Sequence, residues 1–117
     1  MQPLAVHHVS INVADVDEAV AFYTGILGLT VRGDRPVDLG VEGAWLDAGG
    51  QQVHLIKADL PSSQGQHFAL LVADLDATVD ELRSAGLKVS DPSPVGAARQ
   101  SFLKDPAGNL LELHQPA

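Results

Sequence analysis

Four residues with metal-binding side chains stand at repeated spacings along this chain of 117 residues. His8 and His67 lie 59 positions apart, and His54 and Glu112 lie 58 positions apart. Three imidazoles and one carboxylate form a ligand set suited to Fe, Mn, Zn, Ni or Co, rather than to Ca or Mg. The spacing therefore predicts a divalent transition-metal site, provided that the fold brings the four side chains together.

The repeat that contains these residues covers almost the whole chain. The segment that begins at His8, HVSINVADVDEAV, matches the segment that begins at His67, HFALLVADLDATV. Internal repeats of this length indicate two copies of one supersecondary unit. We expect a single domain over residues 1–117, with modules at about 5–57 and 66–115 and a Pro/Ser/Gly/Gln-rich linker at 58–65.

Each copy has the residue pattern of a βαβββ module. Residues 8–13 alternate between apolar and polar, which is typical of a half-buried strand. Asp15 and Asp74 are predicted helix N-caps, and Gly28 and Gly86 are predicted to end the two helices. Because one module leaves a sheet face exposed, the two are expected to pair into an α+β fold. The other strands are predicted at 29–33, 42–47 and 51–57 in the first module and at 87–90, 99–104 and 109–114 in the second.

Strand alternation predicts that the four metal candidates lie on the side of each sheet that faces away from the helix. The apolar positions of each strand must pack against the helix, so the intervening positions point to the opposite side of the sheet. We call that side the ligand face. It is expected to carry the four metal candidates and, beside them, Ser10, Asn12, Gln52 and His114. If the modules pack about a pseudo-two-fold axis, the four metal candidates converge.

The sequence resembles the vicinal oxygen chelate superfamily, which includes glyoxalase I, methylmalonyl-CoA epimerase, extradiol dioxygenases, fosfomycin-resistance enzymes and bleomycin-resistance proteins. The resemblance lies in HVSINVAD with Phe22-Tyr23 and Leu27-Gly28-Leu29, in HFALLVAD, and in DPAGNLLEL near the end. It implies two βαβββ modules that form an open, cup-shaped mixed sheet around a divalent metal. The implied ligands come from the first and last strands of each module and are His8, His54, His67 and Glu112.

The resemblance also implies roles for particular residues. Glu112 would serve both as a ligand and as the catalytic base, whereas His54 stands where glyoxalase I has a glutamate or glutamine. Many family members are homodimers, so a homodimer is expected here, with each site built within one chain or across two. The implied activity is that of a lyase or isomerase acting on a small substrate whose vicinal oxygens are chelated by the metal.

Other polar and aromatic residues are weaker candidates for substrate binding. Trp45 could line a pocket or pack in the core. Arg99 could bind an anionic group or form a surface ion pair, because the alternation in the strand that it shares with Phe102 does not decide which side it faces. His114 is expected beside the metal rather than on it, and His7 is expected to pair locally. The candidate substrate-binding residues are Ser10, Asn12, Gln52, Trp45, Arg99 and Phe102.

Composition and charge exclude several other classes of protein. The net charge of −8 disfavours nucleic acid as a partner, and the absence of cysteine excludes disulfides and thiolate chemistry. No apolar run approaches the roughly 20 residues of a membrane span. No secretory signal is visible, so a cytoplasmic location is expected.

Two alternatives to a metal-dependent lyase or isomerase remain open. A metal-free antibiotic-binding protein of the bleomycin-resistance kind would suit the acidic charge, since such drugs can be cationic. An extradiol-type dioxygenase would need Fe(II) and a more open metal site. Metal content separates the metal-free antibiotic-binding protein from the lyase or isomerase and from the dioxygenase. Oxygen consumption with a catechol separates the dioxygenase from the lyase or isomerase.

Overall fold

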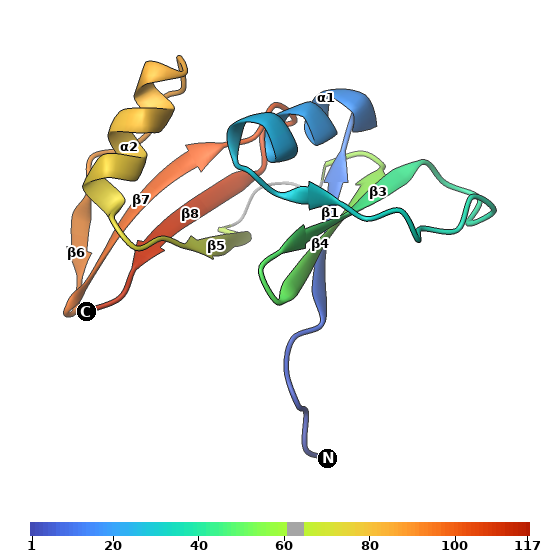
Figure 1. The fold of residues 1–117 in the computed structure, drawn as a ribbon, viewed down its shortest axis with the longest axis horizontal. Helices are drawn as coiled ribbons and strands as arrows, with labels where there is room; N and C mark the ends of the chain where they lie inside the picture. Colours follow the sequence, from blue (N-terminus) through green and yellow to red (C-terminus); the bar gives the residue numbers. More distant parts are fainter. Residues whose placement is uncertain (61–64) are drawn as a thin grey trace. The chain divides into compact units, whose positions relative to one another are not determined.

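The computed structural model describes residues 1–60 and 65–117 and divides into two compact units. Unit 1 is Met1–Ser62 and unit 2 is Ser63–Ala117. Part of the predicted linker, residues 61–64, lies outside the described residues. Each unit has its own sheet and its own helical segment (Figure 1).

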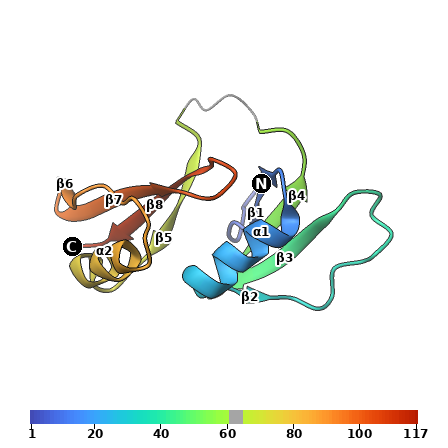
Figure 2. The same cartoon turned by 90° about the horizontal axis from the view of Figure 1, so that it is seen from above.

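Unit 1 is a four-stranded mixed sheet with one helical segment on one face. The strand order is β1-β4-β3-β2, in which β1 and β4 are parallel and the other pairs are antiparallel. The helical segment lies across the sheet, as seen from above in Figure 2. In chain order the elements are β1 (His8–Val13), α1 (Val16–Ala21), the π-helical turn η1 (Phe22–Ile26), β2 (Thr30–Val31), β3 (Gly43–Ala48) and β4 (Gln51–Lys57).

Unit 2 repeats this topology. Its strand order is β5-β8-β7-β6, again with the first two strands parallel. The match between the units confirms the predicted α+β fold of two βαβββ-type modules. The elements of unit 2 are β5 (His67–Leu71), α2 (Leu75–Ser84), β6 (Ser93–Val95), β7 (Ala98–Lys104) and β8 (Leu110–Gln115).

The helices begin and end at the residues that the sequence predicts. The Asp15 carboxylate accepts a hydrogen bond from the Glu18 backbone N–H at 3.0 Å, and Asp74 accepts one from Ala77 at 3.0 Å. These bonds satisfy backbone donors that have no partner within the helix. Gly28 and Gly86 follow the helices with φ angles of 79° and 89°, a left-handed conformation that glycine adopts at little cost.

One predicted strand is wrong. The segment 87–90 is not a strand, and the edge strand of unit 2 is β6, formed a few residues later. The Ser90 backbone N–H does donate to the Phe102 carbonyl at 2.9 Å. However, the Phe102 N–H donates to the Ser90 hydroxyl, at 2.8 Å, and not to a backbone carbonyl. The side chain thereby replaces the backbone acceptor that a regular ladder needs. Pro92 follows with no N–H to donate, so regular pairing resumes only in the β6–β7 hairpin.

The core of each unit lies between the sheet and its helix. In unit 1 Tyr23, Leu46 and Leu55 are fully buried. In unit 2 the equivalent layer contains Leu75, Leu111 and Leu113, all at most 2% exposed. The strand positions between these residues are therefore the ones that form the ligand face.

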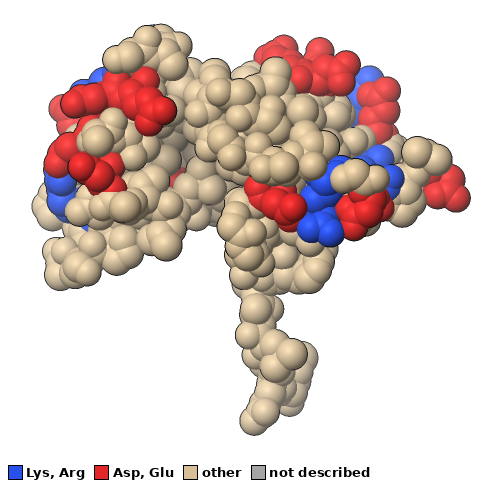
Figure 3. Space-filling view, in the orientation of Figure 1, with Lys and Arg blue, Asp and Glu red and all other residues tan. Residues whose placement is uncertain are grey.

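Acidic side chains gather over the helices. Figure 3 shows clusters of Asp and Glu above both α1 and α2. The first turns of these helices carry Asp17, Glu18 and Asp76, where a carboxylate is favoured by the positive end of the helix dipole. Among the described residues, no helix is long and apolar enough to cross a membrane.

Candidate functional site

The strand registers place the predicted ligands in the middle of each ligand face. In unit 1 His54 is the cross-strand partner of both Ser10 and Trp45. In unit 2 Glu112 is the partner of both Ala69 and Phe102. His54 and Glu112 thus occupy equivalent central positions, each flanked by an aromatic residue from the neighbouring antiparallel strand.

The two predicted ligands of unit 1 form part of a stack of three rings. The His8 and His54 rings lie face to face with centroids 3.9 Å apart, and the Trp45 ring stacks on the other side of His54 at 4.6 Å. The Nε2 atom of His54 lies 2.9 Å from Gln52 Oε1, a contact in which Nε2 must donate. The neutral ring therefore carries its lone pair on Nδ1, which is the atom that can bind a metal.

Burial keeps His54 in the form that a metal requires. Its exposed fraction is 8%. Burial is the largest cause that lowers the pKa of His54, and the nearby His8 and His7 lower it further because two positive imidazolium rings repel. A lowered pKa favours neutral imidazole at neutral pH, so less proton competition opposes metal binding at this residue.

The predicted ligands of unit 2 are in direct contact. The Nε2 atom of His67 lies 3.1 Å from Oε1 of Glu112, and its Nδ1 lies 2.8 Å from the Gly65 carbonyl oxygen. The carbonyl can only accept, so Nδ1 carries a proton. A carbonyl that orients the outer nitrogen in this way is a common feature of metal-binding histidines.

The contact between His67 and Glu112 requires a positive species between the two atoms. If Nδ1 of neutral His67 donates to Gly65, the lone pair on Nε2 points at a carboxylate oxygen only 3.1 Å away. Two lone pairs at this distance repel unless a positive species lies between them. A proton can fill that position, and so can a metal ion after a small opening of the pair. The donor chemistry of unit 2 therefore fits half of a transition-metal site.

Glu112 has a second imidazole partner. His114 lies two residues further along β8, on the same face, and its Nδ1 donates to Glu112 Oε2 at 2.8 Å. The Glu112 side chain is 12% exposed, whereas those of His67 and His114 are 33% and 34% exposed. A nearly buried carboxylate is thus held between two half-exposed histidines, which compensate for its lost hydration.

Five of the six candidate substrate-binding residues lie on the ligand faces. Gln52 bonds His54, the Asn12 amide donates to the Asp59 carbonyl at 2.8 Å, and Ser10 is exposed beside His54. The remaining two are aromatic: Trp45 stacks on His54, and Phe102 meets the His67 ring edge to face at 5.7 Å.

Arg99 lies on the other side of its sheet. It alternates with Phe102 along β7 and shares the helix side with Ser101 and Leu103. Its guanidinium forms a two-pronged ion pair with Asp76 of α2, with N–O distances of 2.8 and 2.9 Å. This pairing lowers the pKa of Asp76 and raises that of Arg99. Of the two roles left open by the sequence, the structure places Arg99 in the ion pair.

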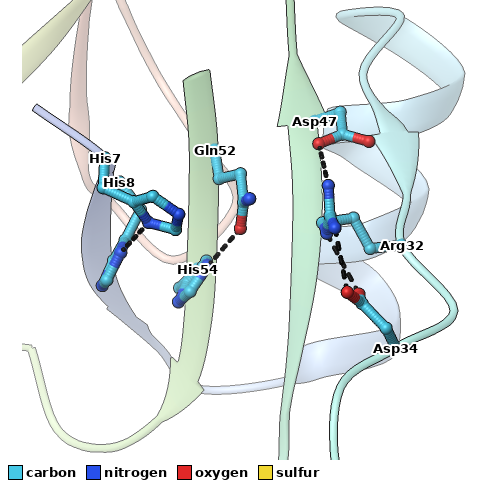
Figure 4. Close-up of polar contacts among 7 residues, drawn as sticks. All are labelled: His7, His8, Arg32, Asp34, Asp47, Gln52 and His54. Carbon is cyan, nitrogen blue, oxygen red and sulfur yellow. Dashed lines mark hydrogen bonds and ion pairs between the residues drawn. The ribbon is translucent and has the colours of Figure 1, made fainter. Parts of the chain in front are cut away.

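The sequence reasoning missed a charged group on the ligand face of unit 1. Arg32 follows β2 and bonds Asp47 of β3 at 2.8 Å and Asp34 at 2.9 and 3.0 Å (Figure 4). Hydrogen bonds from the guanidinium hold the pKa of Asp34 below its usual range. Asp47 is the cross-strand partner of Gln52, so polar side chains continue across the sheet. The alternation in the predicted strand 29–33 would have placed Arg32 on this face.

The described residues present the metal candidates as two separate pairs. Among the residues that the structure describes, no group of three His, Cys, Asp or Glu side chains is arranged so that it could hold a metal ion. Unit 1 also has an open cavity of about 800 Å³, lined by residues that include Asp15, Arg35 and Lys57, but it contains none of the metal candidates. The convergence of His8 and His54 with the other pair remains a prediction.

The chain matches the sequence model of the Glyoxalase/Bleomycin resistance protein/Dioxygenase superfamily over residues 5–113. A protein of Synechocystis sp. named probable lactoylglutathione lyase is 33% identical, and the alignment covers 92% of each chain. A Vibrio cholerae protein with the same name is 29% identical over 92% of this chain and 88% of its own.

Solved structures share the fold over nearly the whole chain. A Bacillus anthracis protein assigned to the glyoxalase family has a TM-score of 0.89 at 24% identity, covering 100% of this chain and 98% of its own. An antibiotic-binding protein from a Streptomyces species has a TM-score of 0.81 at 26% identity, covering 100% and 99%. A variant of the fosfomycin-resistance protein FosX from Listeria monocytogenes, complexed with Mn(II), has a TM-score of 0.83 at 19% identity, covering 99% and 95%.

Proposed function

Because this chain belongs to the Glyoxalase/Bleomycin resistance protein/Dioxygenase superfamily, we propose that it is a metal-dependent lyase or isomerase that acts on a small substrate with vicinal oxygens. The observation that carries the proposal is the contact between His67 and Glu112, in which an imidazole fixed by the Gly65 carbonyl faces a nearly buried carboxylate. This arrangement favours a bound cation.

The proposed metal ligands are the two pairs of imidazole and carboxylate groups. His8 and His54 would supply two nitrogens, and His67 and Glu112 would supply a nitrogen and an oxygen. Such a mixed set suits Mn, Fe, Co, Ni or Zn. The Mn(II) in the FosX variant supports a divalent transition metal in this fold. When bound, the metal would act as a Lewis acid toward the two vicinal oxygens of the substrate.

The reaction needs a group that moves a proton, and Glu112 is the carboxylate placed to do so. It would take a proton from the carbon that bears one substrate oxygen and return it to the neighbouring carbon. His114, bonded to Oε2, keeps one oxygen of the carboxylate occupied, so Glu112 would release the metal from Oε1 and accept the proton on that oxygen. His54 in unit 1 offers imidazole instead of a second carboxylate, and we therefore expect one base rather than two.

The names of the relatives suggest the first substrate to test. Two relatives at about 30% identity are named probable lactoylglutathione lyase. We propose that the substrate is the hemithioacetal formed from a 2-oxoaldehyde and a thiol of the glutathione type, and that its isomerisation gives a thioester. Arg32 on the ligand face of unit 1 could bind a carboxylate of such a substrate if Asp34 released it.

Metal content tests the proposal most simply. Protein prepared without a histidine tag should contain close to one transition-metal ion per chain, measured by plasma mass spectrometry. His67→Ala should lose the metal. His7 contacts the proposed ligand His8 at 3.0 Å, so the control is Asp80→Asn instead, an exposed carboxylate on α2 away from the ligand faces. A wild-type chain that refuses Mn, Fe, Co, Ni and Zn would refute the metal-dependent function.

A homodimer is part of the proposal, and mixing two variants tests how its sites are built. His54→Ala damages only unit 1 and Glu112→Gln damages only unit 2. If each site uses two chains, every mixed dimer keeps one intact site of its two, so a random 1:1 mixture should recover about a quarter of the wild-type number of sites. If each site lies within one chain, mixing should recover none. Light scattering of the wild type measures the dimer itself.

A second candidate function is metal-free binding of an aromatic or cationic drug. The stack of Trp45, His54 and His8 offers a flat aromatic surface, and the net charge of −8 favours cations. The antibiotic-binding neighbour from Streptomyces, 26% identical, supports this alternative. Quenching of Trp45 fluorescence by a planar cationic drug, in protein that binds no metal, would favour this drug-binding function.

An extradiol-type dioxygenase would instead consume oxygen with a catechol and Fe(II).

A further inference from the structure

His114 is the one histidine of unit 2 that the proposed metal set does not use. It follows Glu112 by two residues on β8, so both side chains project from the same face. Its cross-strand partners are Leu71 of β5 and Gln100 of β7. The Nδ1 of His114 donates to Oε2 of Glu112 at 2.8 Å, a short distance typical of a hydrogen bond to a charged acceptor.

The two oxygens of Glu112 are divided between two partners. Oε1 is directed to His67 at 3.1 Å, and Oε2 is directed to His114. The last torsion of a glutamate side chain has broad minima, so a carboxylate held at one oxygen can still rotate. Bonds to both oxygens from opposite sides fix the plane of the group. The direction in which Oε1 points therefore depends on the bond that His114 makes.

We propose that His114 is a positioning residue that keeps Oε1 of Glu112 aimed at the metal. This role rests on the proposed function, because it requires Glu112 to be a ligand. By occupying Oε2, His114 makes Glu112 bind through one oxygen and prevents the carboxylate from turning away from His67. Partners that orient a ligand in this manner change metal affinity by about 10-fold to 100-fold when they are removed.

Three substitutions at position 114 separate the hydrogen bond made by Nδ1 from the bulk of the side chain. Asparagine places an amide N–H close to the position of the histidine Nδ1, so His114→Asn should keep the bond to Oε2. Glutamine places its amide near the position of Nε2 instead, and His114→Leu removes the donor while keeping a similar bulk. If His114 acts by holding Oε2, metal affinity should be retained in the asparagine variant and lost in the leucine variant, and the glutamine variant should have an intermediate affinity.

The experiment is a titration of the full-length protein and its variants with Co²⁺ and Mn²⁺. We expect His114→Leu to bind either ion about 10-fold to 100-fold more weakly and His114→Asn to bind within about threefold of wild type. The visible Co²⁺ spectrum should also change in His114→Leu, because a carboxylate that is free to rotate can bind through both oxygens. Circular dichroism checks that each variant is folded.

The possible outcomes separate this inference from the proposed function. If the wild type binds and His114→Leu binds equally well with the same Co²⁺ spectrum, His114 has no positioning role and the metal site stands. If asparagine fails as badly as leucine, the Nδ1 bond is not the cause and the inference is also refuted. If the wild type binds neither ion, the proposed function is refuted and the role of His114 is refuted with it.

Discussion

A buried serine on β7 gives a prediction whose sign is opposite to the usual effect of a core substitution. Ser101 is fully buried on the helix side of unit 2, and its hydroxyl has no hydrogen-bond partner among the described residues. A buried, unsatisfied polar group costs about 1–3 kcal/mol. Ser101→Ala removes that cost and leaves a gap of only one oxygen atom. We therefore expect the free energy of unfolding to rise by about 1 kcal/mol, which raises Tm by about 4 °C.

The chain offers a matched control on the neighbouring segment. The Ser90 hydroxyl accepts the Phe102 backbone N–H at 2.8 Å, so Ser90→Ala loses a bond and should lower the free energy of unfolding by about 1 kcal/mol. Urea unfolding followed by circular dichroism measures both variants under the same conditions. If Ser101→Ala destabilises the protein as much as Ser90→Ala does, the Ser101 hydroxyl is hydrogen-bonded and the reasoning is refuted.

Three further predictions test the framework of the ligand faces. A methyl group added at Gly43 would collide with the Leu55 carbonyl, so Gly43→Ala should lower the free energy of unfolding by about 2 kcal/mol in the same urea assay. The control is Gly33→Ala, where the added methyl group meets open space and the free energy of unfolding should change by less than about 1 kcal/mol. Trp45→Ala should raise the lowered pKa of His54 toward the ordinary value by exposing the ring, as measured by imidazole NMR, and an unchanged pKa would contradict burial as its cause. Because the folded protein disfavours protonated His54, wild-type stability should fall as the pH drops below the ordinary histidine pKa, and this fall should be smaller in Trp45→Ala.

Much of the fold follows from local patterns in the sequence. The repeat and the alternation of apolar residues identify two βαβββ modules, because these patterns arise from burial of one face of each strand. Asp15 and Asp74 are recognisable as caps because their carboxylates satisfy backbone donors nearby in the sequence. The edge strand of unit 2 was misplaced because the Ser90 hydroxyl bonds the Phe102 N–H, a tertiary contact that no local pattern reveals.

The contacts of the candidate site were less predictable than its faces. Alternation puts His54 and Glu112 at the centre of their faces, and the registers agree. It does not show that Trp45 stacks on His54 or that His114 holds Glu112, because these contacts depend on side-chain rotamers. The side that Arg99 faces was also undecidable, since both faces of its strand contain apolar and polar residues.

The central claim is that one metal ion uses residues from both units. Its most direct test is the affinity for Mn²⁺ of His54→Ala, in unit 1, and of Glu112→Gln, in unit 2, each measured beside the control Asp80→Asn, on the exposed side of α2, by calorimetric titration of metal-free protein. A shared site predicts one ion per chain in the wild type, a loss of at least about 10-fold in affinity in both ligand variants, and no loss in the control. Wild-type affinity in either His54→Ala or Glu112→Gln would contradict a site that draws on both pairs.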